Sequence, residues 1–293
     1  MKKNYLTKTK VILTILVPVI LLAIGTFYDL QIDTVLYNPD SFISKVFAAF
    51  GMFPFSMLLC FTGLSFFRMM HKYNKYLMII LFVVCELFAV YIIHHETKEY
   101  YVNLGIFVYL IDLFVVLILN IIMFPIVGGA STSKLMRYCM FLLLFACIAL
   151  GAVEALKIIC ARPRYMLLVE NNQIQFKNWY TILGNSAIKK EWIAKGVDKD
   201  MFRSFPSGHT LSGSTLLFIS SLGYVNKKFS SKKMANIMYA IALIYIAILA
   251  FTRLVLGCHF LSDVAMSFLI TFISYCILNK LFGIGKDTKK VKA

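Results

Sequence analysis

The sequence predicts an all-α protein, a polytopic bundle of transmembrane helices. Of its 293 residues, 60% are hydrophobic and only 15% are charged, and the mean hydropathy is +0.79. A soluble domain carries about 25% charged and roughly 45–50% apolar residues, so this chain lacks the polar surface that a water-soluble globule needs. The apolar residues also gather in long runs. Composition and pattern together exclude the soluble, secreted, fibrous and disordered classes.

Eight of these runs are candidates for spans, because a spanning helix needs about 20 mainly apolar residues. The first run starts among lysines, yet it is too long for the apolar part of a signal peptide and has no small-residue cleavage site, so we interpret it as an uncleaved span. The predicted spans are Val11–Phe27, Val46–Phe67, Leu77–Ile93, Leu104–Val127, Tyr138–Ile159, Gly208–Val225, Ala235–Val255 and Phe260–Phe282.

The net charge of +16 comes from basic clusters in alternate connections. This pattern indicates the positive-inside rule rather than a nucleic-acid groove, and it predicts that both termini are cytoplasmic and that residues 160–206 face outward. The clusters are Lys2, Lys3, Lys8 and Lys10; Arg68, Lys72 and Lys75; Lys134 and Arg137; Lys227, Lys228, Lys232 and Lys233; and Lys286, Lys289, Lys290 and Lys292.

The chain divides into an N-terminal four-helix transmembrane region, residues 1–137, and a C-terminal core, residues 138–293, which holds four spans and a long outer loop at 160–206. This loop contains Trp179 and Trp192, a residue type that favours the bilayer interface. A solvated connector lying on the headgroups and a cover that gates substrate are equally compatible with this composition.

Several polar residues lie inside or at the end of predicted spans. Glu86 and Asp112 are interpreted as polar contacts between helices, and Asp112 and Asn120 lie two turns apart where they could form such a contact. The His-His-Glu run at 94–96 is interpreted as a cap at headgroup level. The seven cysteines include no CxxC pair, so they predict neither a zinc site nor a disulfide framework.

Three short segments bring polar residues to one predicted plane, the outer ends of spans five to eight. They are residues 157–164, 204–209 and 252–263. Up to four cations meet there, and clustered cations call for an anion; the planar fork of arginine suits phosphate oxygens in particular. These cations are Lys157, Arg162, Arg164 and Arg253.

The second and third segments supply the reacting groups. Ser207 and Gly208 open a helix, where free backbone N–H groups favour anions. His259 and Asp263 share a helix face at spacing i, i+4, so the carboxylate can hold Nδ1 and leave Nε2 as a nucleophile. His209 is placed to protonate a leaving oxygen. This set predicts phosphoryl transfer through a phosphohistidine, with no metal or cofactor, because fixed cations meet the charge of the transition state.

These segments resemble the three-part signature of the type 2 phosphatidic acid phosphatase superfamily, which includes lipid phosphate phosphatases and vanadium haloperoxidases. That signature has Lys, six residues, then Arg-Pro; then Pro-Ser-Gly-His; then Ser-Arg, five residues, His, three residues and Asp. The chain keeps these spacings with Lys157 and Arg164; with Pro206, Ser207, Gly208 and His209; and with Arg253, His259 and Asp263.

Two positions depart from the signature. Tyr165 stands where the family has proline, and Thr252 replaces serine but keeps the hydroxyl. The first departure leaves a choice between Arg162 and Arg164 as the phosphate ligand, and the spacing favours Arg164. Six spans are usual for bacterial lipid phosphatases of this family, so the four spans before the core are two more than expected.

The resemblance implies a role for each matching residue. Lys157, Arg164 and Arg253 would bind phosphate with help from Ser207 and Gly208, His259 would be the nucleophile, Asp263 would orient it, and His209 would be the general acid. Two further residues are possible accessories: Arg162 as an interface anchor and Glu154 as a partner for Lys157.

The resemblance therefore implies a bacterial, multi-pass enzyme of phospholipid metabolism in the cell membrane, with its active site on the extracytoplasmic side. Its partners would be membrane lipids and a lipid phosphate substrate such as phosphatidic acid, phosphatidylglycerol phosphate or undecaprenyl diphosphate, and not nucleic acid. A lipid phosphotransferase with the same site is the alternative. A non-catalytic lipid-phosphate binder or transporter, with Glu86 and Asp112 as a relay, comes third.

Overall fold

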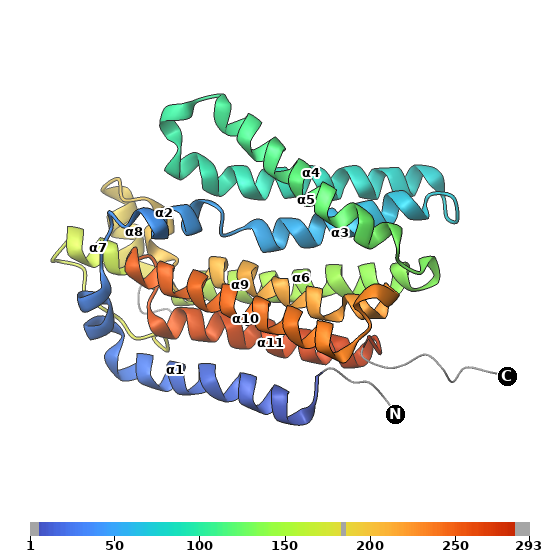
Figure 1. The fold of residues 1–293 in the computed structure, drawn as a ribbon. Coiled ribbons are helices and arrows are strands. Elements are labelled where there is room, and N and C mark those ends of the chain that lie inside the picture. The colour runs from blue at the N-terminus through green and yellow to red at the C-terminus, as the bar shows by residue number, and fades with distance from the viewer. Residues whose placement is uncertain (1–5, 183–185, 285–293) are drawn as a thin grey trace.

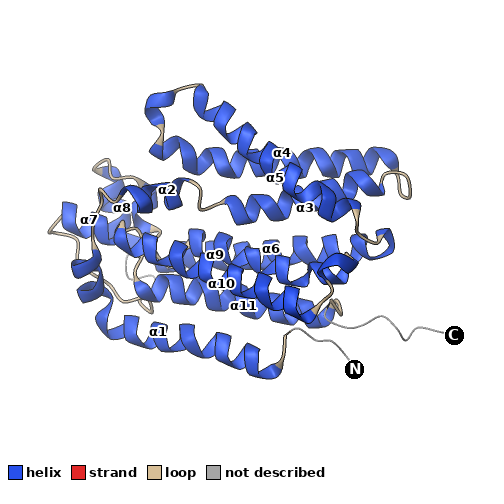
Figure 2. Cartoon of the chain, viewed as in Figure 1, coloured by secondary structure: helices blue, strands red, loops and turns tan. Residues whose placement is uncertain are grey.

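The computed structural model describes residues 6–182 and 186–284. These residues form helices and loops, with no β-strand among them (Figures 1 and 2). The all-α prediction is confirmed. The elements are α1 Lys8–Leu36, α2 Phe42–Ala49, α3 Phe53–Met69, α4 Lys75–Tyr100, η1 Val102–Leu104, α5 Phe107–Gly128, α6 Thr132–Cys160, α7 Tyr165–Glu170, α8 Ser186–Ala194, η2 Lys199–Phe202, α9 Gly208–Thr215, η3 Leu216–Tyr224, η4 Lys227–Phe229, α10 Lys232–Val255 and α11 Leu261–Leu281.

Seven helical segments of the described chain are long and apolar enough to cross a membrane, and they make this a multi-pass membrane protein. Seven of the eight predicted spans correspond to them. The second is interrupted, because α2 ends at Ala49 and α3 begins at Phe53. The seven segments are Lys8–Leu36, Phe42–Met69, Lys75–Tyr100, Phe107–Gly128, Thr132–Glu170, Lys232–Val255 and Leu261–Leu281.

The predicted span Gly208–Val225 differs from the others. It consists of α9 followed directly by the 3₁₀ helix η3, and nearly all of its side chains are buried inside the bundle. A 3₁₀ helix rises about 2.0 Å per residue against 1.5 Å in an α-helix, so the short segment still covers about 30 Å, the thickness of a bilayer core. It runs through the protein interior rather than facing lipid.

The helices form a layered bundle. In Figure 1, α4 and α5 lie along one side with α3 beneath them, α6 and α9–α11 fill the middle, and α1 covers the opposite side against α11. The centre is aromatic: Phe61 from α3, Tyr138 from α6 and Phe218 from η3 are fully buried and in ring contact. The N-terminal helices therefore share one continuous core with the family motifs.

Three turns meet at one end of the bundle, which we call the basic end. Arg68 at the end of α3 donates to the carbonyls of Val127 and Ala130, and Ala130 forms a bridge with Asn226. The turns at 70–74, 129–131 and 225–231 therefore lie together (Figure 1). The first and third carry Lys72, Lys227 and Lys228, and Lys134 follows the second in α6. Lys2, Lys3, Lys286, Lys289, Lys290 and Lys292 lie outside the described residues. That the basic end is cytoplasmic stays a prediction.

Polar contacts join the N-terminal helices to one another. Asn120 on α5 donates to Glu86 on α4 at 2.7 Å. Nearer the other end, Asp112 on α5 contacts two residues of α4, His94 Nδ1 at 2.8 Å and Thr97 Oγ1 at 2.8 Å. Glu86 and Asp112 thus connect helices, as the sequence suggested. Asp112 and Asn120 both form interhelical contacts, as expected, and each contact is to α4.

The loop at 160–206 covers the end of the bundle opposite the basic end, which we call the site end. Trp179 donates from Nε1 to Thr26 Oγ1 on α1 at 2.9 Å and stacks on Phe205, with ring centroids 5.7 Å apart. Phe202 is fully buried in a small core beneath α7 and η2. The loop is therefore packed on the bundle, and it is more than a solvated connector.

Candidate active site

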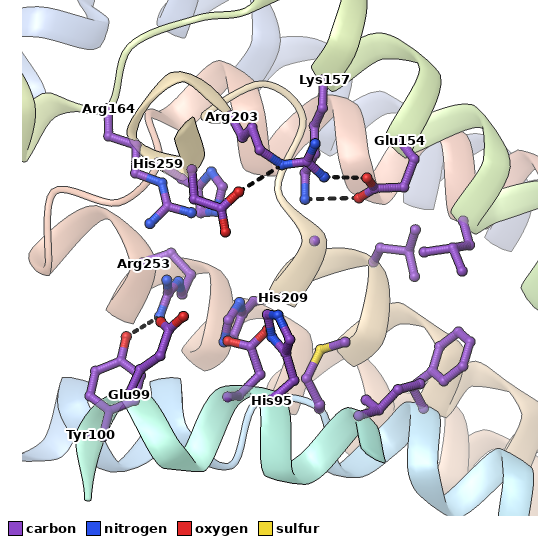
Figure 3. Close-up of a pocket in the computed structure, with 18 of the residues that line it drawn as sticks. His95, Glu99, Tyr100, Glu154, Lys157, Arg164, Arg203, His209, Arg253 and His259 are labelled. Atoms are coloured by element: carbon purple, nitrogen blue, oxygen red, sulfur yellow. Dashed lines mark hydrogen bonds and ion pairs between the residues drawn. The ribbon is translucent and has the colours of Figure 1, made fainter. Parts of the chain in front are cut away.

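A cavity of about 500 Å³ opens at the site end (Figure 3). Its polar lining comes from α4, α6, η2, the start of α9, the end of α10 and the turn before α11. The structure thus brings three separated motifs together around one space. Seven of the predicted site residues line it: Glu154, Lys157, Arg164, Gly208, His209, Arg253 and His259.

His259 lies in the turn between α10 and α11, buried at 2% exposure. Its Nδ1 is 2.6 Å from the carbonyl oxygen of Ser204. Because a carbonyl only accepts, Nδ1 carries the proton and Nε2 holds a lone pair. Burial lowers the pKa of His259 to about 4, so the ring is neutral at neutral pH. This is the state in which an imidazole acts as a nucleophile.

Asp263 lies within ion-pair distance of His259, as the sequence suggested, but the hydrogen bond of Nδ1 goes to Ser204. Oδ2 of Asp263 is 3.8 Å from Nδ1 of His259 and instead accepts hydrogen bonds from Ser204 Oγ and from the backbone N–H of Phe260, the latter at 2.8 Å. The cause is its place in the first turn of α11, where a carboxylate reaches back to the cap residue. Asp263 therefore positions His259 through Ser204, whose carbonyl contacts the ring.

Arg162 lies in the interior and is not an interface anchor as expected, being only 1% exposed. Its Nη2 is 2.9 Å from Asp29 Oδ2 on α1, and its Nη1 is 2.5 Å from Asp263 Oδ1. The guanidinium carbon also stacks over Phe260, 4.1 Å from the ring centroid. The two buried carboxylates compensate the guanidinium charge of Arg162 for its loss of contact with water.

The other cations face the cavity. Lys157 Nζ is 3.1 Å from Glu154 Oε1, and Glu154 also pairs with Arg203 from the loop. Glu154 is thus the partner of Lys157, as expected, while Arg203 was not anticipated. The Nε atoms of Arg164 and Arg253 are buried and have no hydrogen-bond partner among the described residues. Such groups are nearly always paired in folded proteins, so they mark where an anion fits.

The second motif begins α9. Ser207 is the N-cap, and its hydroxyl accepts from the N–H and from Oγ1 of Thr210 at 3.3 and 3.1 Å. It stands behind the cavity wall and shapes the helix start. A side chain at Gly208 would place its Cβ 3.0 Å from Lys157 Nζ. The glycine therefore gives room to the lysine head and leaves the backbone open to a ligand.

The N-terminal region supplies part of the site, which the sequence did not reveal. His209 Nε2 is 2.9 Å from the carbonyl oxygen of Ala48 on α2 and 3.5 Å from Glu96 Oε2 on α4. The run at 94–96 is not one cap, because His94 turns to α5 while Glu96 faces His209. The sequence signal for this contribution was Glu96 itself, an acidic residue at the end of an apolar run, on the same predicted side of the membrane as the motifs.

Comparison with known families supports the assignment of the three motifs. The model of the PAP2 superfamily matches residues 134–283, a range that contains all three motifs. Comparison with curated proteins and with solved structures gave no match. The family match covers half of the chain and includes the residues of the three motifs that line the cavity. The chain therefore belongs to the PAP2 superfamily, and this membership indicates a phosphatase that acts on phosphate esters.

Proposed function

We propose that this protein is a membrane phosphatase that hydrolyses a lipid phosphate or diphosphate, with His259 as nucleophile and His209 as general acid. One observation carries the proposal: two histidines and three cations from separate motifs line the same cavity. The arrangement combines a neutral imidazole, a second imidazole and the motif cations Lys157, Arg164 and Arg253, which we call the positive wall. Carboxylates also line the cavity: Glu96, Glu99, Glu154, Asp198 and Asp200. The two imidazoles and the positive wall are the parts that phosphoryl transfer through a phosphohistidine requires.

The phosphate would sit against the positive wall. Arg164 and Arg253 each offer a buried Nε–H without a partner among the described residues, and Lys157 adds an ammonium beside Gly208. The N–H groups at the start of α9 also favour an anion. Arginine forks and a helix N-terminus are the two commonest ways in which proteins bind phosphate oxygens.

The reaction follows from the positions of the two imidazoles. Nε2 of His259 attacks phosphorus while the bond from phosphorus to the lipid oxygen breaks, and its electron pair stays on that oxygen, which takes a proton from His209. Water then attacks the phosphohistidine, His209 takes a proton from it, and the P–N bond breaks to release phosphate. Arg164, Arg253 and Lys157 balance the charge of both transition states.

The cavity also has an apolar part that suits a lipid tail. Phe88 and Tyr91 on α4 line it and are 40% and 60% exposed on the flank of the bundle, which faces hydrocarbon in a membrane. A long chain could therefore stay in lipid while its phosphate reaches the cations. The apolar lining residues are Met52, Phe55, Phe88, Tyr91, Ile92, Leu150 and Leu211.

The proposed location is the extracytoplasmic face of the cell membrane. The cavity lies at the site end, and the lysine-bearing turns lie at the basic end. Basic connections stay in the cytoplasm in most membrane proteins, which supports a site on the outer leaflet. Phosphatidic acid, phosphatidylglycerol phosphate and undecaprenyl diphosphate are the candidate substrates.

The test is phosphate release in detergent from these three lipids, comparing the wild-type protein with His259→Ala and His209→Ala. We expect losses of about 10²-fold or more, the usual contribution of an acid–base group, and more for the nucleophile. His71→Ala, at an exposed histidine of the basic end, should retain full activity. Wild-type rates in both active-site variants would contradict the assignment of nucleophile and acid.

A further inference from the structure

Glu96 is a carboxylate on α4, outside the segment that matches the family, and it faces His209. We propose that Glu96 is a positioning residue which stabilises the protonated form of His209 and thereby brings the N-terminal helices into the proton-transfer step. The inference rests on the proposed function, because it concerns the acid of that reaction. It assigns to α4 a role that the three motifs do not supply.

The contacts of His209 define which ring nitrogen can react. Nε2 lies 2.9 Å from the carbonyl oxygen of Ala48 and 3.5 Å from Glu96 Oε2. Both partners are acceptors, so Nε2 keeps a proton in either charge state. Nδ1 is then the nitrogen that can give a proton to a leaving oxygen. A carboxylate at one ring nitrogen with chemistry at the other is the arrangement of the serine protease triad.

The charges around His209 explain why it needs an anion. The ring is buried at 6% exposure, and Arg253 from α10 and His259 from the α10–α11 turn both act against its protonation. A buried imidazolium beside a guanidinium is unfavourable without a compensating charge. Glu96 supplies that charge, since its side chain is 19% exposed and within ion-pair distance of Nε2.

The groups that face this pair come from four elements. On α4, His95 Nδ1 lies 3.5 Å from Glu96 Oε1. On α10, the guanidinium of Arg253 attracts the negative charge of the Glu96 carboxylate. His259 approaches from the α10–α11 turn, and α2 presents only the carbonyl of Ala48. Among these groups Glu96 is the carboxylate in ion-pair contact with His209.

The N-terminal region is shaped to hold this contact. The other face of α4 is fixed to α5, because Thr97 and His94 both contact Asp112. This orients Glu96 toward α9. Beside the same edge of the ring, a Cβ at Gly51 would lie 2.3 Å from His209 Cδ2, so the glycine between α2 and α3 leaves room for the imidazole. Figure 3 shows His209 against the α4 segment that carries His95.

A comparison of leaving groups separates proton donation from general damage. A nitrophenolate leaves without a proton, whereas an alkoxide needs one. The experiment measures kcat on dodecyl phosphate and on 4-nitrophenyl phosphate for the wild-type protein, Glu96→Gln, Glu96→Asp and His209→Asn. Glu86→Gln is the matched control, because Glu86 is a second buried carboxylate on α4 that binds Asn120 away from the cavity.

We expect Glu96→Gln to lose about tenfold or more on dodecyl phosphate and less than about threefold on 4-nitrophenyl phosphate, part of the 10²–10⁴-fold that a general acid supplies. His209→Asn should show the same selectivity more strongly, and adding Glu96→Gln to it should cost nothing further. Because removal of the carboxylate favours neutral His209, the alkaline limb of kcat on dodecyl phosphate should move to lower pH. Glu96→Asp should restore part of both effects.

Equal losses on both substrates in Glu96→Gln, or no loss, would overturn this inference while leaving the proposed function intact. The same holds if Glu86→Gln reproduces the selectivity. Elution in detergent reports whether a variant has folded, so equal losses count against the inference only for a variant that elutes like the wild-type protein. If Glu96→Gln does not, Glu96→Asp decides. If the wild-type protein releases phosphate from neither substrate, the proposed function fails first and this inference with it.

Discussion

Single side chains in this site act through one another. Arg162 joins Asp29 on α1 to Asp263 on α11, and Asp263 in turn fixes Ser204, whose carbonyl contacts His259. His259, the proposed nucleophile, is thus held by a chain of buried groups rather than by one carboxylate. Removing a member of such a network leaves an uncompensated charge in the interior. The position of His259 therefore depends on residues that never meet the substrate.

The pH dependence of activity follows from the burial of His259. Desolvation disfavours its charged form and lowers its pKa to about 4, so the nucleophile stays neutral as pH falls to 5 and is protonated only near pH 4. We expect the acid limb of kcat/KM, which reports the free enzyme, to lie well below 6.5, the ordinary pKa of histidine. The measurement uses 4-nitrophenyl phosphate from pH 3.5 to 7.

Two controls make that profile interpretable. The ionisation of the substrate is measured separately by ³¹P NMR, and each acid-treated sample is returned to pH 7 to show that activity recovers. An acid limb at or above pH 6.5 that substrate ionisation does not explain would contradict a neutral, desolvated nucleophile.

At the scale of single residues, the spacing of residues within the motifs determined what the sequence could predict. The positions of Lys157, Arg164, His209 and His259 in fixed motifs placed them at one membrane face, and the structure brings all four to one cavity. The partners of these residues could not be predicted. Arg162 was expected at the interface, and its burial could not be foreseen. Its buried partner Asp29 lies 133 residues away in the chain, and no local pattern connects the two.

Among the elements, the break between α2 and α3 has the clearest consequence for the site. Gly51 lies in this break, and a Cβ there would be 2.3 Å from His209 Cδ2 and 2.8 Å from the carbonyl oxygen of Phe47. We expect Gly51→Ala to displace the imidazole and lower kcat on a lipid phosphate by about tenfold or more, since small misplacements of catalytic groups are costly. Phosphate release in detergent measures it.

The matched control is Gly151→Ala on α6, where an added Cβ meets nothing within 4 Å. Alanine is the better helix former by about 1 kcal/mol, so this variant should keep full activity and unfold no earlier than the wild-type protein. If Gly51→Ala retained wild-type kcat, the packing of the break against His209 would have no catalytic importance.

Hydropathy predicted the presence of the spanning elements better than their form. An apolar run such as Val46–Phe67 looks continuous, yet the helix breaks at residues 50–52, where Gly51 packs closely against His209. The run Gly208–Val225 indicated a helix, and its second half is 3₁₀. A run that is buried on all sides has no amphipathic period to separate the two helix types. Both differences arise from packing between distant segments.

At the scale of the whole molecule, the basic end and the site end give a testable topology. Lys190 on α8 and Lys227 on η4 are both exposed and lie at opposite ends of the bundle (Figure 1). In intact cells, a membrane-impermeant maleimide should label Lys190→Cys but not Lys227→Cys, and both after lysis. The wild-type chain gives the background, because five of its seven cysteines are buried. The reverse pattern would place the site in the cytoplasm.

The N-terminal helices and the family segment form one unit at this scale. The sequence offered no catalytic reason for the four helices before residue 138. In the structure they provide Asp29, Ala48 and Glu96, which contact Arg162 and His209. Hydropathy and motifs describe each half separately, and only the packed bundle joins them.

The buried bridge between α1 and Arg162 also bears on how the protein is made. Asp29 enters the membrane early, and its partner is synthesised 133 residues later, a delay on the order of 10 s at ribosomal rates of about 5–20 residues per second. An unpaired carboxylate in hydrocarbon is costly, so Asp29 stays hydrated or protonated until Arg162 has been synthesised and has packed against it. Ser262, its other contact, comes 233 residues after it. The buried bridge that supports His259 is therefore complete only after α11 has docked against α1.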